Sequence, residues 1–116
     1  RGPGDFPPEW HDFFDNTAKA RAPSWLNKIT VRSIKDSLDY DPTQYIHLIA
    51  PTPLLMIVAE NDVITPTELE EQAFAHAKEP KKLVVVPGGH FEAYDGPKFP
   101  AFVNPATEWF EQHLMK

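Results

Sequence analysis

The stretch PLLMIVAENDVITP, residues 53–66, decides the fold class of this chain. It contains six consecutive apolar residues, Leu54 to Ala59, with a proline before them and the polar turn Glu60-Asn61-Asp62 after them. A short apolar run bounded in this way is typical of a strand that is buried on both faces of a parallel sheet. We therefore predict a central strand over residues 54–59, with Asp62 just beyond its carboxyl end.

A second strand and a connecting helix are predicted downstream. A second buried strand is predicted from Lys82 to Val86, which is apolar from Leu83 onward and ends at Pro87-Gly88-Gly89. Between the strands, Thr65-Pro66-Thr67-Glu68 has the pattern of a capping box with proline at the first helical position, which predicts a helix from Pro66 to about Lys78. Its apolar face is expected to consist of Leu69, Ala73, Phe74 and Ala77. The strand–helix–strand order predicts two parallel neighbours joined by a right-handed crossover.

The segments on either side of this unit predict helices. Apolar spacing predicts one helix over residues 8–20, a second over about 27–38, and a short one from Pro42 to Leu48 that Asp41 caps. The second stays ambiguous, because Thr30 and Val31 are β-branched and favour strands. At the C-terminus one helical face is predicted, with a kink or a fresh start at Pro105; it comprises Phe99, Phe102, Val103, Ala106, Trp109, Phe110 and Leu114. Two strands cannot bury these faces, so we expect further strands from elsewhere.

Composition bounds the class of protein. The 116 residues are 41% hydrophobic and 12% aromatic, which is enough apolar material for a packed core. The net charge of −6 and the lack of a basic stripe argue against a nucleic-acid partner. No apolar stretch approaches the ~20 residues of a membrane helix, so a membrane partner is not expected either. The absence of cysteine excludes disulfides, thiolate metal sites and cysteine nucleophiles, and leaves the cellular compartment open.

Two titratable residues follow the two predicted strands. Asp62 lies three positions past the first strand, and His90 follows the second through a glycine pair that allows a sharp turn. Because the carboxyl ends of parallel strands meet at one edge of a sheet, we expect the two side chains to be neighbours. A carboxylate bonded to one ring nitrogen of a histidine fixes its tautomer and leaves the other nitrogen to take a proton from a nucleophile. The pair therefore predicts an acid–base dyad that awaits a nucleophile.

Each of these residues alone has a plainer interpretation. An aspartate after a strand is commonly a turn or helix-flanking residue, and a histidine after two glycines is commonly a surface loop residue. It is the pairing that favours catalysis. Glu60 and Asn61 are interpreted as solvated turn groups. His90, Glu92 and Asp95 lack the paired histidines typical of a metal site, so we expect no metal and no cofactor.

Two segments together resemble the α/β-hydrolase fold family. PLLMIVAENDVITP is similar to the strand that carries the triad acid, and VPGGHF, residues 86–91, is similar to the segment that carries the triad histidine. The family's chain order of nucleophile, acid and histidine also fits, since Asp62 precedes His90 by 28 positions with one helix between them. The resemblance covers residues 21–116 and is greatest to fungal and bacterial dienelactone-hydrolase-like hydrolases and polyketide transferases.

This resemblance implies an α/β architecture, the C-terminal portion of an α/β-hydrolase fold. Residues 1–50 would be the end of a helical cap and its linker, and residues 51–116 a parallel βαβ unit with a C-terminal helix. The implied activity is that of a serine-type, esterase- or lactonase-like hydrolase of an ester, lactone or related small carbonyl substrate, with Asp62 and His90 as triad residues. The alternatives are transfer of an acyl or polyketide group, and a non-catalytic interaction subunit or pseudoenzyme fragment.

The chain departs from the family because it has no nucleophile elbow. No G-x-S-x-G motif occurs, since no serine has glycines at the required spacing; the serines are Ser24, Ser33 and Ser37. Ala59 stands where the family often has glycine, a small change at a strand end. The opening Arg1-Gly2-Pro3-Gly4 resembles the middle of a longer polypeptide. We therefore expect these residues to be inactive alone and to need, as a partner, the N-terminal part of the hydrolase core that carries the nucleophile.

Overall fold

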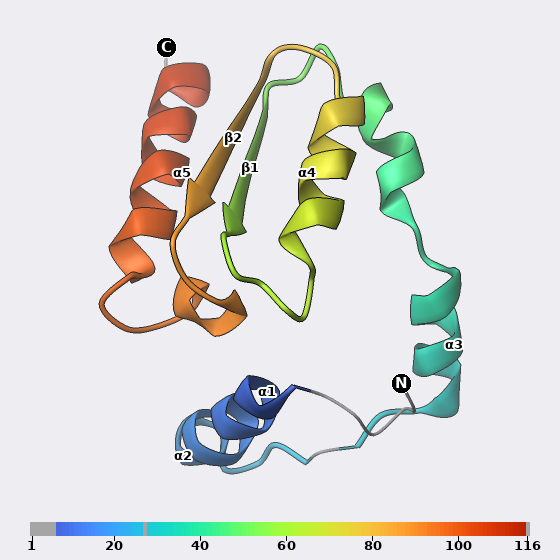
Figure 1. Ribbon diagram of the computed structural model, residues 1–116, viewed down its shortest axis with the longest axis vertical. Coiled ribbons are helices and arrows are strands. Elements are labelled where there is room, and N and C mark those ends of the chain that lie inside the picture. The colour runs from blue at the N-terminus through green and yellow to red at the C-terminus, as the bar shows by residue number, and fades with distance from the viewer. Residues whose placement is uncertain (1–6, 27, 116) are drawn as a thin grey trace. The chain divides into compact units, whose positions relative to one another are not determined.

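The computed structural model describes residues 7–26 and 28–115, which form two compact units that divide between Pro42 and Thr43 (Figure 1). The first unit is helical. The second contains a two-stranded parallel sheet with helices. The predicted division into a cap and linker over residues 1–50 and a core over residues 51–116 stays a prediction.

The first unit begins with a continuous helical segment of three parts. These are α1 (Pro8–Asp12), the π-helical η1 (Phe13–Ala18) and α2 (Lys19–Arg21), which together match the helix predicted over residues 8–20. The Phe14 ring lies 4.1 Å from the Trp10 ring and 5.3 Å from the Trp25 ring, centroid to centroid. The aromatic side chains therefore pack on one another within this unit.

Helix α3 (Val31–Asp39) resolves the ambiguity at Thr30 in favour of a helix. It begins later than the expected position near Asn27, which itself lies outside the described residues. The reason is that Thr30 caps the helix: its backbone is extended, and its Oγ1 accepts a hydrogen bond from the Ser33 N–H at 3.1 Å. A β-branched residue therefore marks the helix start here, and does not begin a strand.

The second unit contains the predicted strands in parallel register. A 3₁₀ helix, η2 (Pro42–Leu48), leads to β1 (Leu54–Ala59), which pairs with β2 (Lys81–Val86) from Leu54 opposite Lys81 to Ala59 opposite Val86. The bounds of η2 and β1 are as predicted, and β2 begins one residue earlier. Burial is less complete than the apolar run suggested, because in β1 only Val58 and Ala59 are buried and the other four residues are half-buried.

Helices α4 (Thr67–His76) and α5 (Phe99–Leu114) flank the two strands (Figure 1). Helix α4 packs against β1, and α5 packs against both strands and against η3 (His90–Ala93). The centre of the core is formed by Ala59, Val86 and Phe102, one residue from each of β1, β2 and α5. This core holds the carboxyl ends of the two strands in place. The turns that carry Asp62 and His90 begin at these ends.

Two details of the helix predictions were wrong. The capping box does not form: α4 begins at Thr67 with Pro66 at its N-cap and no side-chain cap hydrogen bond, because the Thr65 hydroxyl bonds to Asp62. Leu69 does not join the buried face of α4, since 59% of it is exposed. For the C-terminal segment, a kink or a fresh start is expected at Pro105. The structure shows one helix, α5, that continues through Pro105, so no fresh start occurs there.

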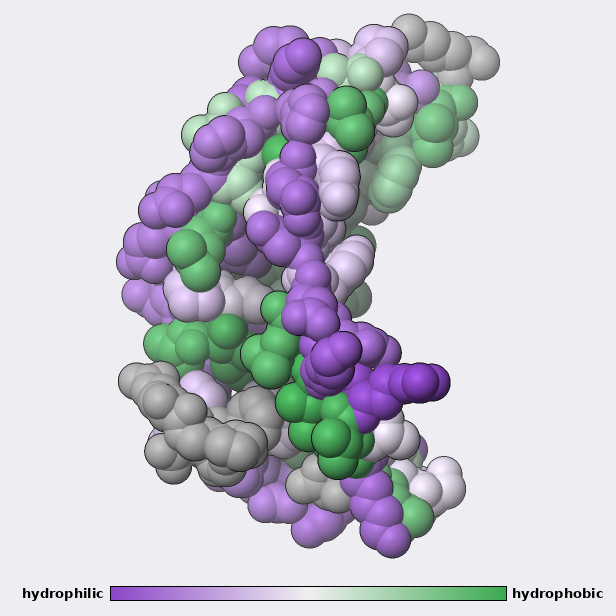
Figure 2. Space-filling view, turned by 90° about the vertical axis from the view of Figure 1, so that its right-hand side faces the viewer, coloured by the Kyte–Doolittle hydropathy of each residue, from purple (hydrophilic) through white to green (hydrophobic). Residues whose placement is uncertain are grey.

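Much apolar surface of the described residues faces solvent. Figure 2 shows hydrophobic residues among hydrophilic ones at the surface. Exposed apolar side chains of the second unit include Leu69, Val85, Phe99, Phe110 and Leu114. A sheet of two strands covers too little of these helices, which agrees with the expectation of further strands. No helix of residues 7–26 and 28–115 is long and apolar enough to cross a membrane.

Candidate active site

The turns after the two strands are held together by backbone hydrogen bonds. The ladder continues past the last strand residues: the Glu60 N–H donates to the Val86 carbonyl at 2.8 Å, and the Asn61 N–H donates to the Gly88 carbonyl at 2.9 Å. These bonds bring the segment that ends in Asp62 alongside the segment that leads to His90. The register of the parallel strands thereby places both side chains at one edge of the sheet.

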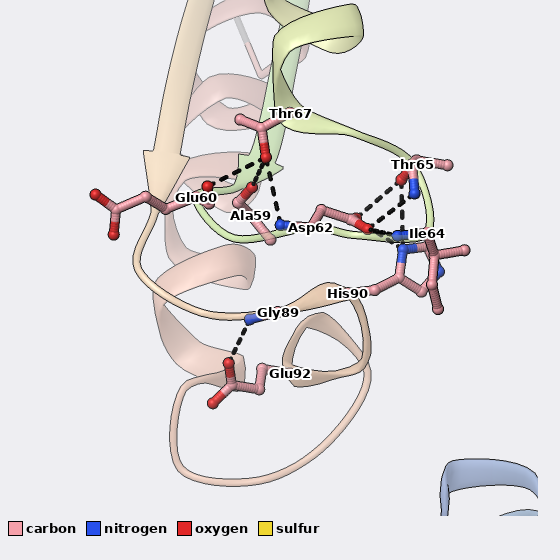
Figure 3. Close-up of polar contacts among 9 residues, drawn as sticks. All are labelled: Ala59, Glu60, Asp62, Ile64, Thr65, Thr67, Gly89, His90 and Glu92. Carbon is pink, nitrogen blue, oxygen red and sulfur yellow. Dashed lines mark hydrogen bonds and ion pairs between the residues drawn. The ribbon is translucent and has the colours of Figure 1, made fainter. Parts of the chain in front are cut away.

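At that edge, Asp62 and His90 form a direct pair (Figure 3). The Asp62 Oδ2 atom lies 2.7 Å from His90 Nδ1, a short distance for a hydrogen bond between a ring N–H and a carboxylate. The side chain of Asp62 is 5% exposed and that of His90 is 21% exposed. The acid is therefore enclosed by protein, while the histidine ring keeps an accessible edge.

The carboxylate of Asp62 accepts four hydrogen bonds. Oδ1 accepts from the Ile64 N–H at 2.8 Å and from the Thr65 N–H at 2.9 Å. Oδ2 accepts from the Thr65 hydroxyl at 2.8 Å and from His90 Nδ1 at 2.7 Å. An ionised carboxylate offers about four lone-pair sites, so its accepting capacity is filled.

These bonds decide the charge of the acid. Burial alone would raise the pKa of Asp62, but the hydrogen bonds from His90, Thr65 and Ile64 outweigh burial and hold the pKa below its ordinary value. Asp62 is therefore a carboxylate at neutral pH. An ionised acid at Nδ1 favours the tautomer in which Nδ1 carries the proton and Nε2 is free to accept one.

A buried threonine, Thr67, supports the turn that carries Asp62 (Figure 3). Its hydroxyl donates to the Ala59 carbonyl at 2.6 Å, with the Glu60 carbonyl at 3.2 Å, and its oxygen accepts a long hydrogen bond of 3.4 Å from the Asp62 N–H. Thr67 is the first residue of α4 and is 8% exposed. It therefore links the strand end, the acid and the following helix.

The histidine turn depends on Gly88 and Glu92. Gly88 has a φ of +149°, a conformation that favours glycine, and a Cβ added there would collide with the Glu92 carboxylate. That carboxylate accepts a hydrogen bond from the Gly89 N–H and pairs with Lys98 Nζ at 2.9 Å. The ion pair and the backbone bond lower the pKa of Glu92. Glu92 therefore fixes the residue that immediately precedes His90.

Two aromatic rings border the histidine. The ring centroids of Phe91 and Tyr94 lie 5.0 and 5.8 Å from that of His90, with Phe91 edge-on. Tyr94 is 62% exposed. The His90 ring thus has two aromatic neighbours, one of which, Tyr94, is largely exposed to solvent.

The other residues considered from the sequence lie outside this pair. Glu60 and Asn61 are exposed, and the Glu60 side chain points away from His90 (Figure 3). In the part of the chain that the structure describes, no group of three histidines, aspartates or glutamates is placed to hold a metal ion. The structure thus brings Asp62 and His90 together and leaves their neighbours in the turns to other roles.

The sequence did not reveal the roles of Thr65, Thr67 and Glu92. The sequence pattern predicts a helix cap at Thr65, gives Thr67 no role of its own, and offers Glu92 only as a possible metal ligand. The signal was present in part, because threonines three and five residues after an acidic turn residue are placed to bond back to that turn. Which oxygen each one bonds is decided by the fold.

The chain is similar to proteins of known fold over its greater part. It is 33% identical over 89 residues to a polyketide transferase, grgF, of a Penicillium species, and 29% identical over 87 residues to a thiohydrolase of Eupenicillium brefeldianum. These alignments cover 76% and 74% of this chain but only 30% and 28% of the relatives. No protein-family model matches the chain.

Two solved structures have a similar fold. The crystal structure of the α/β hydrolase GrgF from Penicillium aligns with a TM-score of 0.72 and 31% identity, covering 85% of this chain and 35% of that protein. A hypothetical protein of Pseudomonas aeruginosa, PA2218, also aligns with a TM-score of 0.72, at 28% identity over 98% of this chain and 36% of that protein. The chain spans about a third of the length of these proteins, and in the curated relatives it corresponds to their C-terminal part.

Proposed function

The chain has the C-terminal part of the α/β-hydrolase fold, and from this premise we propose that Asp62 and His90 are the acid and the base of a catalytic triad. The nucleophile, on this proposal, lies outside residues 1–116. The single observation that carries the proposal is the hydrogen bond of 2.7 Å between Asp62 Oδ2 and His90 Nδ1 at the carboxyl ends of two adjacent parallel strands. Catalytic groups of open α/β sheets collect at that edge.

The proposed reaction is hydrolysis through a covalent acyl intermediate. His90 Nε2 takes the proton of a nucleophile hydroxyl as its oxygen attacks the substrate carbonyl. The resulting imidazolium is stabilised by the ionised Asp62 and then gives its proton to the leaving group. A water molecule reverses these steps: His90 takes its proton, the hydroxide attacks the acyl group, and the nucleophile recovers its hydrogen. No cofactor is needed at any step.

The substrate class is an ester, a thioester or a lactone. All three have a carbonyl carbon that an activated hydroxyl can attack and a leaving group that His90 can protonate. One relative is named a thiohydrolase, which favours a thioester among these substrates.

Transfer of the acyl group to an alcohol or amine is the second candidate function. It is favoured by one specific observation, the name polyketide transferase that several relatives carry. The dyad serves both reactions, because His90 deprotonates an alcohol acceptor in the same way as water. Product analysis with a thioester substrate, in the presence and absence of an alcohol acceptor, separates the two: hydrolysis gives the acid and transfer gives a new ester.

Labelling with a fluorophosphonate probe tests the proposed triad. The intact protein, including any polypeptide that precedes residue 1, is expected to be labelled on its nucleophile. His90→Ala is expected to abolish labelling, and His76→Ala, an exposed histidine of α4, is the matched control that keeps it. Residues 1–116 alone are expected to remain unlabelled. Equal labelling of wild type and His90→Ala would refute the proposal, and no labelling of the intact protein would favour a non-catalytic interaction subunit or pseudoenzyme.

A further inference from the structure

Thr65 contacts the acid of the dyad twice. Its backbone N–H donates to Asp62 Oδ1 at 2.9 Å, and its hydroxyl donates to Asp62 Oδ2 at 2.8 Å (Figure 3). Two bonds from one residue to the two oxygens of a carboxylate fix both its position and the orientation of its plane. The rotation of the Asp62 carboxyl group about its last bond is therefore restrained by Thr65.

The same hydroxyl lies beside the histidine. Thr65 Oγ1 is 3.4 Å from His90 Nδ1, and both groups bond to the same oxygen, Asp62 Oδ2. The hydroxyl has a single hydrogen, which it donates to the ionised carboxylate at 2.8 Å. Its oxygen lone pairs are then the groups that face His90 Nδ1. Thr65 thus borders the bond through which Asp62 orients the imidazole.

A second carboxyl group, that of Glu70, lies near enough for the charges of Asp62 and His90 to affect its pKa. Glu70, in the first turns of α4, interacts with the Thr65 side chain as well as with the charges of Asp62 and His90. Burial and the negative charge of Asp62 raise the pKa of Glu70, and the Thr65 side chain and the charge of His90 partly oppose that effect. The two carboxyl groups therefore differ: Asp62 holds its charge with four donors, whereas Glu70 is disfavoured as an anion beside it.

We propose that Thr65 is a positioning residue, which fixes the plane of the Asp62 carboxylate and so holds His90 in the orientation and tautomer that the reaction requires. This inference rests on the proposed function, because a positioning role has meaning only if His90 acts as a base. Thr65 is proposed to act on His90 through Asp62, without a contact to the nucleophile or the substrate.

The substitutions Thr65→Val and Thr65→Ser separate the hydroxyl from the rest of the side chain. Valine has the shape of threonine and keeps the backbone N–H, but loses the bond to Oδ2; serine keeps both bonds. We expect fluorophosphonate labelling of the intact protein to be about tenfold slower in Thr65→Val, the effect of one lost charge-assisted hydrogen bond, and to be restored in Thr65→Ser. Glu70→Gln, which removes the second carboxyl group, is expected to label at the wild-type rate or faster.

A carboxyl titration followed by carbon NMR gives a readout that does not depend on activity. In Thr65→Val the pKa of Asp62 is expected to rise toward its ordinary value of 3.8, because one of the bonds that lower it is gone, and Thr65→Ser is expected to leave it low. The Asp62 signal is assigned by its absence in Asp62→Asn.

The outcomes distinguish this inference from the proposed function. No labelling of the wild type would overturn the proposed function. Labelling of Thr65→Val at the wild-type rate, with an unchanged Asp62 titration, would overturn the inference about Thr65 alone. Slower labelling of Glu70→Gln to the extent seen in Thr65→Val would also overturn it, because the hydroxyl would then serve Glu70 and not Asp62.

Discussion

The substitution Asp62→Asn is expected to disable His90 as the general base while leaving the fold in place. An asparagine has one carbonyl oxygen and one amide group in the positions of two carboxylate oxygens that each accept two bonds. The Oδ1 position faces two backbone N–H groups, Ile64 and Thr65, which cannot reverse their role. The carbonyl is therefore expected at Oδ1, and the amide at Oδ2, where it donates to His90 Nδ1.

This arrangement selects the wrong tautomer of the histidine. Once Nδ1 accepts a hydrogen bond from the amide, the ring proton resides on Nε2, and Nε2 can no longer take a proton from a nucleophile. The same substitution in a serine-protease triad lowers kcat about 10⁴-fold, and we expect a loss of about 10³- to 10⁴-fold here, or ~4–5.5 kcal/mol in the activation barrier. Stability should fall by only ~1–3 kcal/mol, because two of the four bonds keep their geometry.

The rate constant for fluorophosphonate labelling of the intact protein measures the first quantity, and urea unfolding measures the second. Glu60→Gln is the matched control, since it removes one carboxylate from the same turn at an exposed side chain that points away from His90. That control is expected to label at the wild-type rate. A loss in Asp62→Asn of less than tenfold, with folding intact, would refute the reasoning, because the tautomer of His90 would then not depend on this residue.

Three further predictions concern the turns around the dyad. Gly88→Ala is expected to lower the free energy of unfolding by ~1–3 kcal/mol, because φ is positive at this position and the new Cβ meets the Glu92 carboxylate. Thermal denaturation measures this loss of stability, and a loss smaller than the error of the method would contradict the prediction. Thr67→Val, isosteric but without the hydroxyl that bonds to the Ala59 carbonyl, is expected to cost ~1–3 kcal/mol in urea unfolding, and an unchanged midpoint would count against this role. The pKa of Asp62 is lowered on folding, so its contribution to stability is full above the unfolded value of 3.8 and is lost as the pH falls through the lower folded value. The difference in unfolding free energy between wild type and Asp62→Asn should therefore shrink below pH 3.8, and a difference that grows with acid would exclude this linkage.

The strands and the chain order of the dyad could be predicted because they depend on local patterns. The apolar run from Leu54 to Ala59 is bounded so sharply that its predicted and observed limits coincide. Parallel pairing followed from the single helix between the two strands. The approach of Asp62 and His90 then followed from strand direction alone, although their catalytic role stays a prediction.

The roles of Thr65 and Leu69 could not be predicted, because two local rules compete at each. Thr65 has the pattern of a helix cap, but its hydroxyl bonds more favourably to an ionised carboxylate three residues earlier than to a helix N–H. Leu69 has helical spacing with Ala73, yet it is 59% exposed, because the elements that the structure describes leave that side of α4 uncovered. A periodicity predicts which face is apolar, and only the tertiary partners decide whether it is buried.

The acid of this dyad is held mainly by its own turn. Three of the four donors to Asp62 belong to Ile64 and Thr65, within three residues, and only His90 comes from a distant part of the chain. The contacts within this turn therefore hold the charged carboxylate in place even without the bond to His90. A carboxylate whose donors are already oriented has no reorganisation cost when positive charge develops on the neighbouring imidazole. His90, with 21% of its side chain exposed and one bond to the acid, is the partner that can exchange protons, and the division of roles between the two residues follows from this difference in how they are held.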